Sequence, residues 1–202
     1  GLAVLLAPPV HYGVTDYAGG FAGAISVAPA ALTAYLRAIV QALLADRVAH
    51  VCLVNNHLEP AHDAAVRAAI DGLDPTRTSV ACPLTRRWAR TLSDEFKHGE
   101  CHAGRYETSI VLAHAPELVD EDRARALPEV PVSLSAQINA GVHTFAAMGM
   151  RDAYAGAPAA ATPDEGRALI DRLAEMIEAE VIEHMQGGSG APNTDAPATR
   201  IG

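Results

Sequence analysis

The sequence predicts an α/β fold, a single-domain three-layer α/β/α sandwich with a mostly parallel sheet. Short segments that are apolar along their whole length alternate with longer segments in which apolar residues recur at helical spacing. Strands without a polar face are typical of sheets that helices cover on both sides. In such sheets ligands bind beyond the carboxyl ends of the strands, so chemistry is expected in the segments that follow the strands.

The predicted elements alternate along the chain. Residues 2–10 form an apolar run that contains two prolines and predicts a first buried strand. The glycine-rich stretch after it predicts a loop, because glycine permits backbone conformations that other residues avoid. The remaining elements are predicted as strands at 48–54 and 79–82 and as helices at 30–46, 61–73, 86–96, 107–115 and 166–185.

Composition narrows the class of protein. Of the 202 residues, 50% are hydrophobic, which suits one globular domain with a substantial core. The formal net charge of −9 disfavours a protein that binds nucleic acid through its phosphates, and no apolar run reaches the roughly 18 residues of a membrane helix. The three cysteines lack CxxC spacing, so a reduced, cytoplasmic setting is expected. We predict an α/β domain over 1–185 and, from its Gly, Pro and Ser content, a flexible tail over 186–202.

The clearest chemical pattern follows the strand predicted at 48–54, where the chain reads Asn-Asn-His-Leu-Glu. In an extended segment, residues two apart point to the same side, so His57 and Glu59 could face one site. An imidazole and a carboxylate together suit Zn²⁺ or Mn²⁺. Such a pair more often lies in a solvated loop, and its position directly after a buried strand raises the expectation of a metal site.

Residues 99–109 bring an acid, a thiol and an imidazole together ahead of a predicted helix. His102 could act as a general acid or base, because an unperturbed imidazole titrates near neutrality. Glu107 fits either a pocket or a helix start, where the helix macrodipole favours a carboxylate. Cys101 could be a nucleophile paired with His102, or a small residue in a pocket wall.

Other side chains carry less specific predictions. His62, at the start of a predicted helix, is expected to be solvated. His11 and His143 lie in predicted loops beside glycines, where they could line a pocket. Trp88, the single tryptophan, is expected to pack in the interior.

Several motifs along the chain occur together in a recognisable order. Asn55-x-His57 ends the second predicted strand, and the most specific motif is His102-Ala103-Gly104-x-x-Glu107-Thr108-Ser109. The others are Pro8-Pro9 with Tyr12-Gly13, Phe21-x-Gly23-x-Ile25-Ser26, Pro116-Glu117-Leu118-Val119 and Gly156-x-Pro158. In this order, the motifs make the chain similar to the creatininase family over most of its length.

The resemblance implies a two-metal amidohydrolase, in which a water activated by two divalent ions, Zn or Mn with Fe as a further candidate, attacks an amide carbon. His57 and Glu59 match metal ligands, and His102 matches the histidine that shuttles a proton to the leaving nitrogen. The implied substrate is a small cyclic amide or a formamide, and the implied assembly is a homo-oligomer, with a hexamer as one candidate. The residues expected to contact the substrate are Leu58, Cys101 and Glu107.

The sequence departs from the family pattern at several positions. Tyr17 and Ala18 replace a Glu-His pair, and Cys101 replaces an acidic residue. Leu58 replaces an aromatic residue, so creatinine itself is not the expected substrate. The family's first strand normally leads into a segment with a glutamate, a histidine and a bridging aspartate. The domain over 1–185 is therefore expected to lack its N-terminal strand and ligand segment.

These departures leave two alternatives to the metal-dependent hydrolase. The first is a catalytically inactive homologue that serves as a binding or assembly subunit. The second is a hydrolase that uses Cys101 as its nucleophile and needs no metal. Metal content distinguishes the first from the enzyme, and sensitivity to a thiol reagent distinguishes the second.

Overall fold

The computed structural model describes residues 3–187, which are arranged around a two-stranded parallel sheet. Strand β1 (Val51–Val54) pairs with β2 (Thr78–Ala81), with Val51 opposite Thr78 and Val54 opposite Ala81. Parallel strands need a crossover connection, and α2 (Pro60–Ala68) lies within it. Compared with the strand predicted at 48–54, β1 begins three residues later, at Val51.

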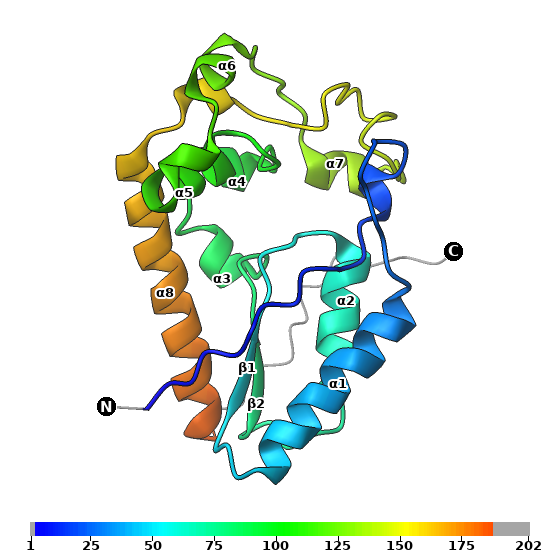
Figure 1. Ribbon diagram of the computed structural model, residues 1–202, viewed down its shortest axis with the longest axis vertical. Coiled ribbons are helices and arrows are strands. Elements are labelled where there is room, and N and C mark those ends of the chain that lie inside the picture. Colours follow the sequence, from blue (N-terminus) through cyan, green and yellow to red (C-terminus); the bar gives the residue numbers. More distant parts are fainter. Residues whose placement is uncertain (1–2, 188–202) are drawn as a thin grey trace.

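Helices cover both faces of this sheet (Figure 1). On one face, Leu53 and Val80 pack against α2 and α1 (Pro29–Ala45). On the other, Cys52 and Ala81 pack against α8 (Pro163–Met185). Successive strand residues thus face opposite layers, as the pleat of a strand requires. The predicted layered α/β fold is confirmed, with a smaller sheet than the sequence indicated.

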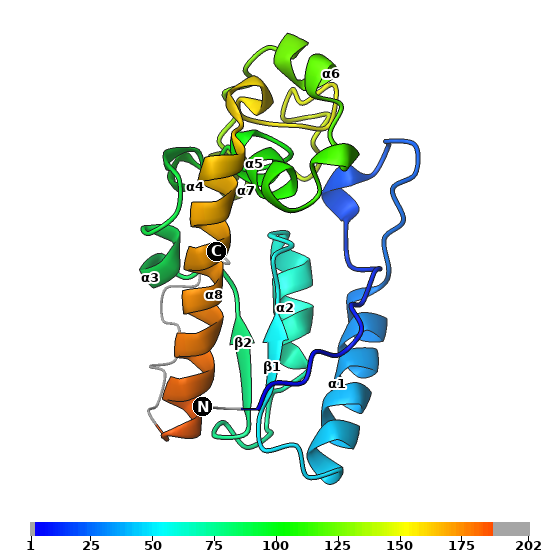
Figure 2. The same cartoon turned by 60° about the vertical axis from the view of Figure 1, so that its left-hand side comes forward.

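The remaining helices gather beyond the carboxyl ends of the strands (Figures 1 and 2). They are α3 (Arg86–Ala89), α4 (Asp94–His98), α5 (Arg105–His114), α6 (Glu121–Ala126), α7 (Leu134–Asn139) and the 3-10 helices η1 (Asp16–Ala18), η2 (Pro116–Leu118) and η3 (Pro158–Ala160). Helix α5 crosses α8 so closely that a Cβ on Gly166 would collide with the carbonyl oxygen of Ser109. Among residues 3–187, no helix combines the length and the apolar character needed to cross a membrane.

Local sequence explains where the helices begin. Helix α8 starts at Pro163, where proline loses no helical hydrogen bond, and the Thr162 hydroxyl accepts the N–H of Glu165 at 3.2 Å. The predicted helix at 86–96 is divided into α3 and α4, because Ser93 caps α4 by accepting the N–H of Phe96. The helix predicted at 61–73 ends at Ala68.

The strand predicted at 2–10 is wrong for the part that the structure describes. Residues 3–10 belong to no strand, and every one of them is exposed, with Leu6 at 92%. Within the described residues, the backbone from 3 to 12 forms no hydrogen bond. A strand that is apolar on both faces needs a hydrogen-bonded neighbour and two covering layers, and this segment has neither here. Of the predicted tail over 186–202, residues 188–202 lie outside the described part.

Candidate functional site

The loop after β1 is shaped by the buried Asn55. Its backbone N–H donates to the Ala81 carbonyl at 2.9 Å, which extends the sheet by one bond. Its side-chain oxygen accepts the N–H of His57 at 3.0 Å, a turn of the kind that asparagine favours. Glu59 then stands at the N-cap of α2, followed by Pro60 at the first helical position. The strand end, the turn and the helix start together fix where the His-Leu-Glu segment lies.

His57 and Glu59 face each other across this loop. The His57 Nε2 and the Glu59 Oε2 lie 3.9 Å apart. Their environments differ, because 42% of the His57 side chain is exposed and only 4% of the Glu59 side chain. Burial raises the pKa of Glu59, while hydrogen bonds from the backbone of Asp16 and Tyr17 oppose that shift. The pair therefore joins a solvent-accessible imidazole to a carboxylate enclosed by protein.

Both side chains are bound to the backbone of the glycine-rich segment. The Glu59 carboxylate accepts the N–H of Asp16 at 2.9 Å and of Tyr17 at 3.4 Å, the first amides of η1. The His57 Nε2 lies 2.8 Å from the Val14 carbonyl oxygen, to which it donates in the tautomer that this contact requires. The two candidate ligands thus also anchor residues 14–17 against the end of the sheet.

His62 belongs to the same group of side chains, although the sequence predicted a solvated residue. Its ring meets that of His57 edge to face, with centroids 4.7 Å apart, and its Nδ1 accepts the N–H of Val14 at 3.2 Å. Burial and the neighbouring His57 lower the pKa of His62. A Cβ on Gly13 would lie 2.5 Å from this ring, so glycine is required there. In the sequence, Gly13 is the one sign that a ring such as that of His62 packs against this part of the backbone.

His102 reaches the site from the loop between α4 and α5. Its carbonyl accepts the N–H of Ala155 at 2.8 Å, and its ring packs on Phe145 with centroids 4.4 Å apart. Phe145 in turn donates its N–H to the carbonyl of Tyr17 at 2.9 Å. Because Glu59 holds the amide of Tyr17, the segment around η1 joins the two loops.

The environment of His102 corrects the expectation of a pKa near neutrality. Burial, and then the nearby His57, lower the pKa of His102 to about 4. Its imidazole is therefore neutral at pH 7 and can accept a proton at rest. Once protonated, it would be a strong acid for an imidazole and would return the proton readily.

Glu107 serves the structure of the same loop. Its carboxylate accepts the N–H of Ala103 at 2.7 Å, and Ala103 has a φ of +49°, in the left-handed region that a non-glycine residue adopts only when its surroundings hold it there. Burial raises the pKa of Glu107, and the hydrogen bond from Ala103 and then His57 offset only part of that shift. Glu107 lies in the first turn of α5, as the helix-start interpretation expects, and also interacts electrostatically with His57.

Leu58 and Cys101 point into the interior. Both pack in an apolar cluster formed with Leu92, Phe96, Tyr106 and Leu169. Burial raises the pKa of the Cys101 thiol to about 12, and the nearby Glu107 adds to the shift. The thiol is therefore protonated at neutral pH, which argues against a cysteine nucleophile, since the thiolate is the reactive form. Trp88 packs in the interior as expected and donates to Glu180 at 3.1 Å.

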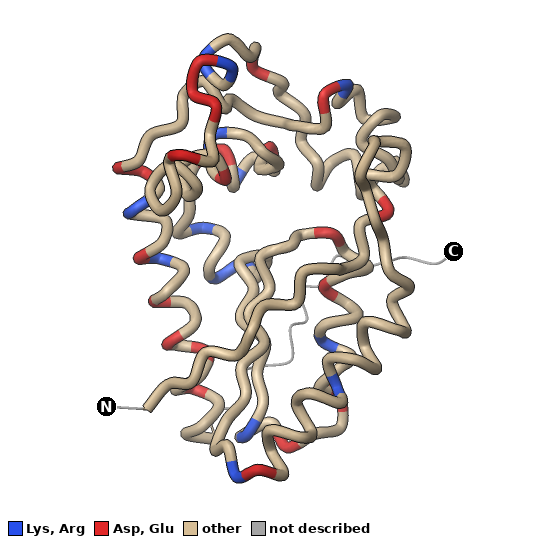
Figure 3. The backbone as a smooth tube through the Cα atoms, in the orientation of Figure 1, with Lys and Arg blue, Asp and Glu red and all other residues tan. Residues whose placement is uncertain are grey.

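A groove of about 410 Å³ opens beside His57. It is lined by Val10, His11, Tyr12, Gly13, Thr15, Ile25, Val54, Asn55, Asn56, His57 and His62. None of these residues is a lysine, arginine, aspartate or glutamate, and Figure 3 shows the same absence of charge along the N-terminal segment. His11 lines this groove, as its place in a predicted loop beside glycine suggested. Glu59, buried behind its backbone partners, does not contribute to it.

The donors present do not fit the two-metal centre that the motifs implied. Among residues 3–187, no three histidine, cysteine, aspartate or glutamate side chains come together in a way that could hold a metal ion. The His57 Nε2 and both carboxylate oxygens of Glu59 are also engaged by the backbone of residues 14–17. These two residues could supply part of one coordination sphere, but two metal ions need more ligands than they provide.

Known proteins of similar sequence and fold place the chain in a family. The profile of the family described as Creatininase: Creatinine amidohydrolase matches residues 1–181. A mycofactocin precursor peptide peptidase from Mycobacterium ulcerans (strain Agy99) is 31% identical over 178 residues, which cover 86% of this chain and 63% of that protein. The chain thus spans less than two thirds of that relative.

Solved structures agree with this assignment at the level of the fold. The structure named "Creatininase Mn" is 21% identical, with a TM-score of 0.58, and a mutant creatininase of "Zn-Zn type" is 20% identical, with a TM-score of 0.57. Each match covers 86% of this chain and 72% of the other. From the profile match over residues 1–181 and the motifs described above, the chain belongs to the creatininase family.

Proposed function

We propose that this chain belongs to an amidohydrolase that cleaves a carbon–nitrogen bond, with His102 as its proton shuttle. The observation that supports the proposal is the convergence on His57. Its Nε2 lies 3.9 Å from the buried carboxylate of Glu59, and His57 lowers the pKa of His102. Phe145 joins the two loops, because its ring packs on His102 and its N–H donates to the carbonyl of Tyr17, whose own N–H donates to Glu59. Imidazoles and carboxylates from two separate loops, gathered at the carboxyl ends of the strands, are typical of a catalytic site in an α/β fold.

The proposed role of His102 follows from its protonation state. Amide hydrolysis needs a water that loses a proton and a departing nitrogen that gains one. A neutral His102 can accept the first proton, and its low pKa favours release to the nitrogen. The ring of Phe145 and the backbone bond to Ala155 hold the imidazole in one orientation. Glu107 would support this role through the Ala103 amide, one residue from His102.

The metal dependence of the family enters this proposal through His57 and Glu59. They would be two ligands of a divalent ion, with Zn or Mn expected and Fe as a further candidate, as the Mn and Zn forms of creatininase suggest. When bound, such an ion lowers the pKa of a coordinated water. Among residues 3–187, no third histidine, cysteine, aspartate or glutamate joins them in a way that could hold the ion.

The groove beside His57 supports an uncharged substrate, because no charged side chain lines it. We propose a small cyclic amide or a formamide other than creatinine. Leu58 stands where creatininase has an aromatic residue, and it packs in the interior rather than in the groove. The exposed amide of Asn56 could bind a neutral amide group of the substrate.

A peptide is the second candidate substrate. The relative that supports it is described as a precursor peptide peptidase, and it is 31% identical to this chain, against 20–21% for the creatininase structures above. A groove with both apolar and amide side chains could also accept an extended backbone. Homo-oligomeric assembly and a cytoplasmic location are proposed from the family resemblance and from the cysteine content.

The proposal is tested by hydrolysis assays of the purified protein with added Zn²⁺ or Mn²⁺, using cyclic amides, formamides and short peptides. His102→Asn should lower turnover by about 10²-fold, the usual contribution of general acid–base catalysis. His114→Asn, on the exposed end of α5, is the matched control and should leave turnover unchanged. Full turnover in His102→Asn would eliminate the shuttle. No turnover and no bound metal would favour the inactive binding or assembly subunit.

A further inference from the structure

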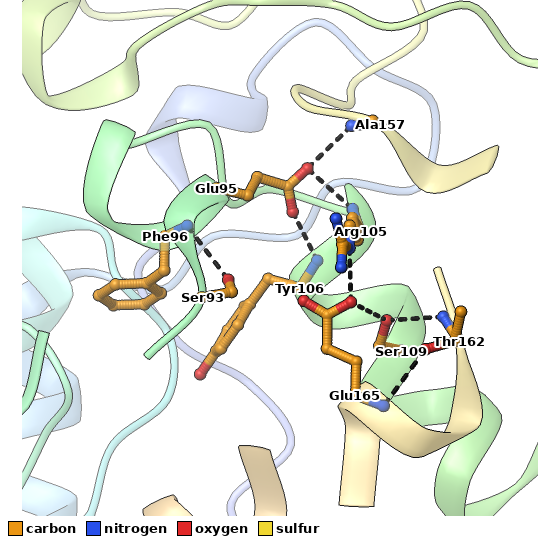
Figure 4. A network of polar contacts seen from close by, with 9 residues as sticks. All are labelled: Ser93, Glu95, Phe96, Arg105, Tyr106, Ser109, Ala157, Thr162 and Glu165. Atoms are coloured by element: carbon orange, nitrogen blue, oxygen red, sulfur yellow. Dashed lines mark hydrogen bonds and ion pairs between the residues drawn. The ribbon is translucent and has the colours of Figure 1, made fainter. Parts of the chain in front are cut away.

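Glu95 makes an unusually complete set of contacts for a carboxylate outside the groove. It lies on α4, and one oxygen accepts the N–H of Arg105 at 2.9 Å and of Ala157 at 2.8 Å. The other oxygen accepts the N–H of Tyr106 at 2.5 Å. Figure 4 shows these bonds reaching the first turn of α5 and the segment before η3. The carboxylate thus joins three separate parts of the backbone and satisfies N–H groups that a helix start leaves without partners.

The surrounding backbone leaves room for this carboxylate and little else. A Cβ on Gly104 would lie 2.5 Å from the Glu95 Oε1, and a Cβ on Gly156 would collide with the same atom. Gly156 also has a φ of +93°, a conformation that favours glycine. Glycine is therefore required at positions 104 and 156, in the two chain segments that flank the carboxylate. One of these glycines belongs to the His-Ala-Gly motif itself.

These contacts enclose the loop that carries His102. Residues 99–104 run from the end of α4 to the start of α5, and Glu95 contacts both ends, because its own carbonyl accepts the N–H of Glu100 at 3.1 Å. Ala157, which Glu95 also holds, is two residues from Ala155, the backbone partner of His102. The loop and the segment that pairs with it are both fixed to one side chain.

We propose that Glu95 is a positioning residue that sets His102 and Glu107 relative to His57. The inference rests on the proposed function for its kinetic part, whereas its structural part stands on the contacts alone. Two oxygens that accept three N–H groups require a carboxylate. A glutamine would turn an NH₂ group, itself a donor, towards one set of amide donors and would leave that set unpaired.

The main test compares Glu95→Gln with Glu165→Gln. Glu165 lies in the same network but contacts the Arg105 and Ser109 side chains rather than the backbone of the loop (Figure 4). In Glu95→Gln, hydrogen exchange at the Ala155 amide should become about tenfold faster or more, because the loop that carries its acceptor, the His102 carbonyl, is no longer held. Turnover should fall by about tenfold, with KM changed less than about twofold, because displacement of a proton donor affects the chemical step. Glu165→Gln should show neither effect.

The outcomes separate this inference from the proposed function. A folded Glu95→Gln protein with wild-type exchange at Ala155, or one with faster exchange and unchanged turnover, would overturn the positioning role. If Glu95→Gln does not fold, Glu95→Asp keeps the charge but shortens the reach, and wild-type exchange at Ala155 in that folded variant would overturn it as well. Faster exchange in Glu95→Gln together with full turnover in His102→Asn would refute the shuttle, and with it the kinetic part of the Glu95 role.

Discussion

The two loops of the candidate site are held in different ways. The loop over residues 55–59 is anchored largely by its own side chains, because Asn55 shapes the turn and Glu59 holds the backbone of η1. The loop over 99–104 is anchored mostly from outside, by Glu95 and by the pairing of His102 with Ala155. The first loop presents an imidazole that is 42% exposed, and the second an imidazole whose pKa is lowered to about 4. Two histidines of the candidate site thus differ in exposure and in pKa because their loops are held differently.

The largest effect on stability is expected from the self-anchored loop. Glu59→Ala would remove the buried carboxylate and with it the charged acceptor of the Asp16 and Tyr17 N–H groups, at a cost of about 2–3 kcal/mol in the free energy of unfolding. Glu59→Gln, which keeps one acceptor oxygen, should cost clearly less. Urea denaturation measures the free energy of unfolding of both variants and of the wild type. Equal and small losses would mean that η1 is held by other contacts and that the carboxylate is free for another role.

The second loop predicts a pH dependence of stability. Because the pKa of His102 falls from about 6.5 in the unfolded chain to about 4 in the fold, the unfolded chain binds a proton that the folded chain does not. Its contribution is therefore complete above pH 6.5 and is lost as the pH falls towards 4, by on the order of 1–3 kcal/mol.

His102→Asn should flatten the pH dependence between these values. The wild-type slope also contains the smaller shifts of His50 and His62, which have the same direction and remain in the variant. Denaturation curves at several pH values measure the difference between the two proteins. Parallel pH profiles for wild type and His102→Asn would show that the imidazole is not buried in solution.

The smallest effect on stability is expected from His57→Ala. With 42% of the His57 side chain exposed, the substitution removes mainly its contact with the Val14 carbonyl and its ring contact with His62, so the free energy of unfolding should change by about 1 kcal/mol. Affinity for Zn²⁺ or Mn²⁺ and turnover should nevertheless fall, because a ligand would be lost. Calorimetric titration of the metal and a thermal melt separate the two effects. Unfolding with metal affinity retained would identify His57 as a structural residue.

The difference between the loops also explains what the sequence could predict. The strand at 51–54 and the His-Leu-Glu segment after it leave a local pattern. The structure places His57 and Glu59 3.9 Å apart, although only His57 lines the groove. Glu95 leaves no such pattern, because its partners are backbone amides 10, 11 and 62 residues away, whose side chains carry no information about it. The apolar run at 3–10 was misleading for a related reason, since hydrophobicity cannot tell whether a neighbouring strand is present.

The central claim is that His102, half-buried in the loop over 99–104, lies close enough to His57 to feel its charge, so that the two loops form one site. It is tested most directly by following the imidazole C–H resonances of His102 by NMR as a function of pH, in the wild type and in His57→Ala. The account predicts a pKa near 4 for His102 and a rise in His57→Ala, because the effect of His57, which lowers the pKa of His102, is removed. A pKa near 6.5, the ordinary value for histidine, unchanged by His57→Ala, would contradict it.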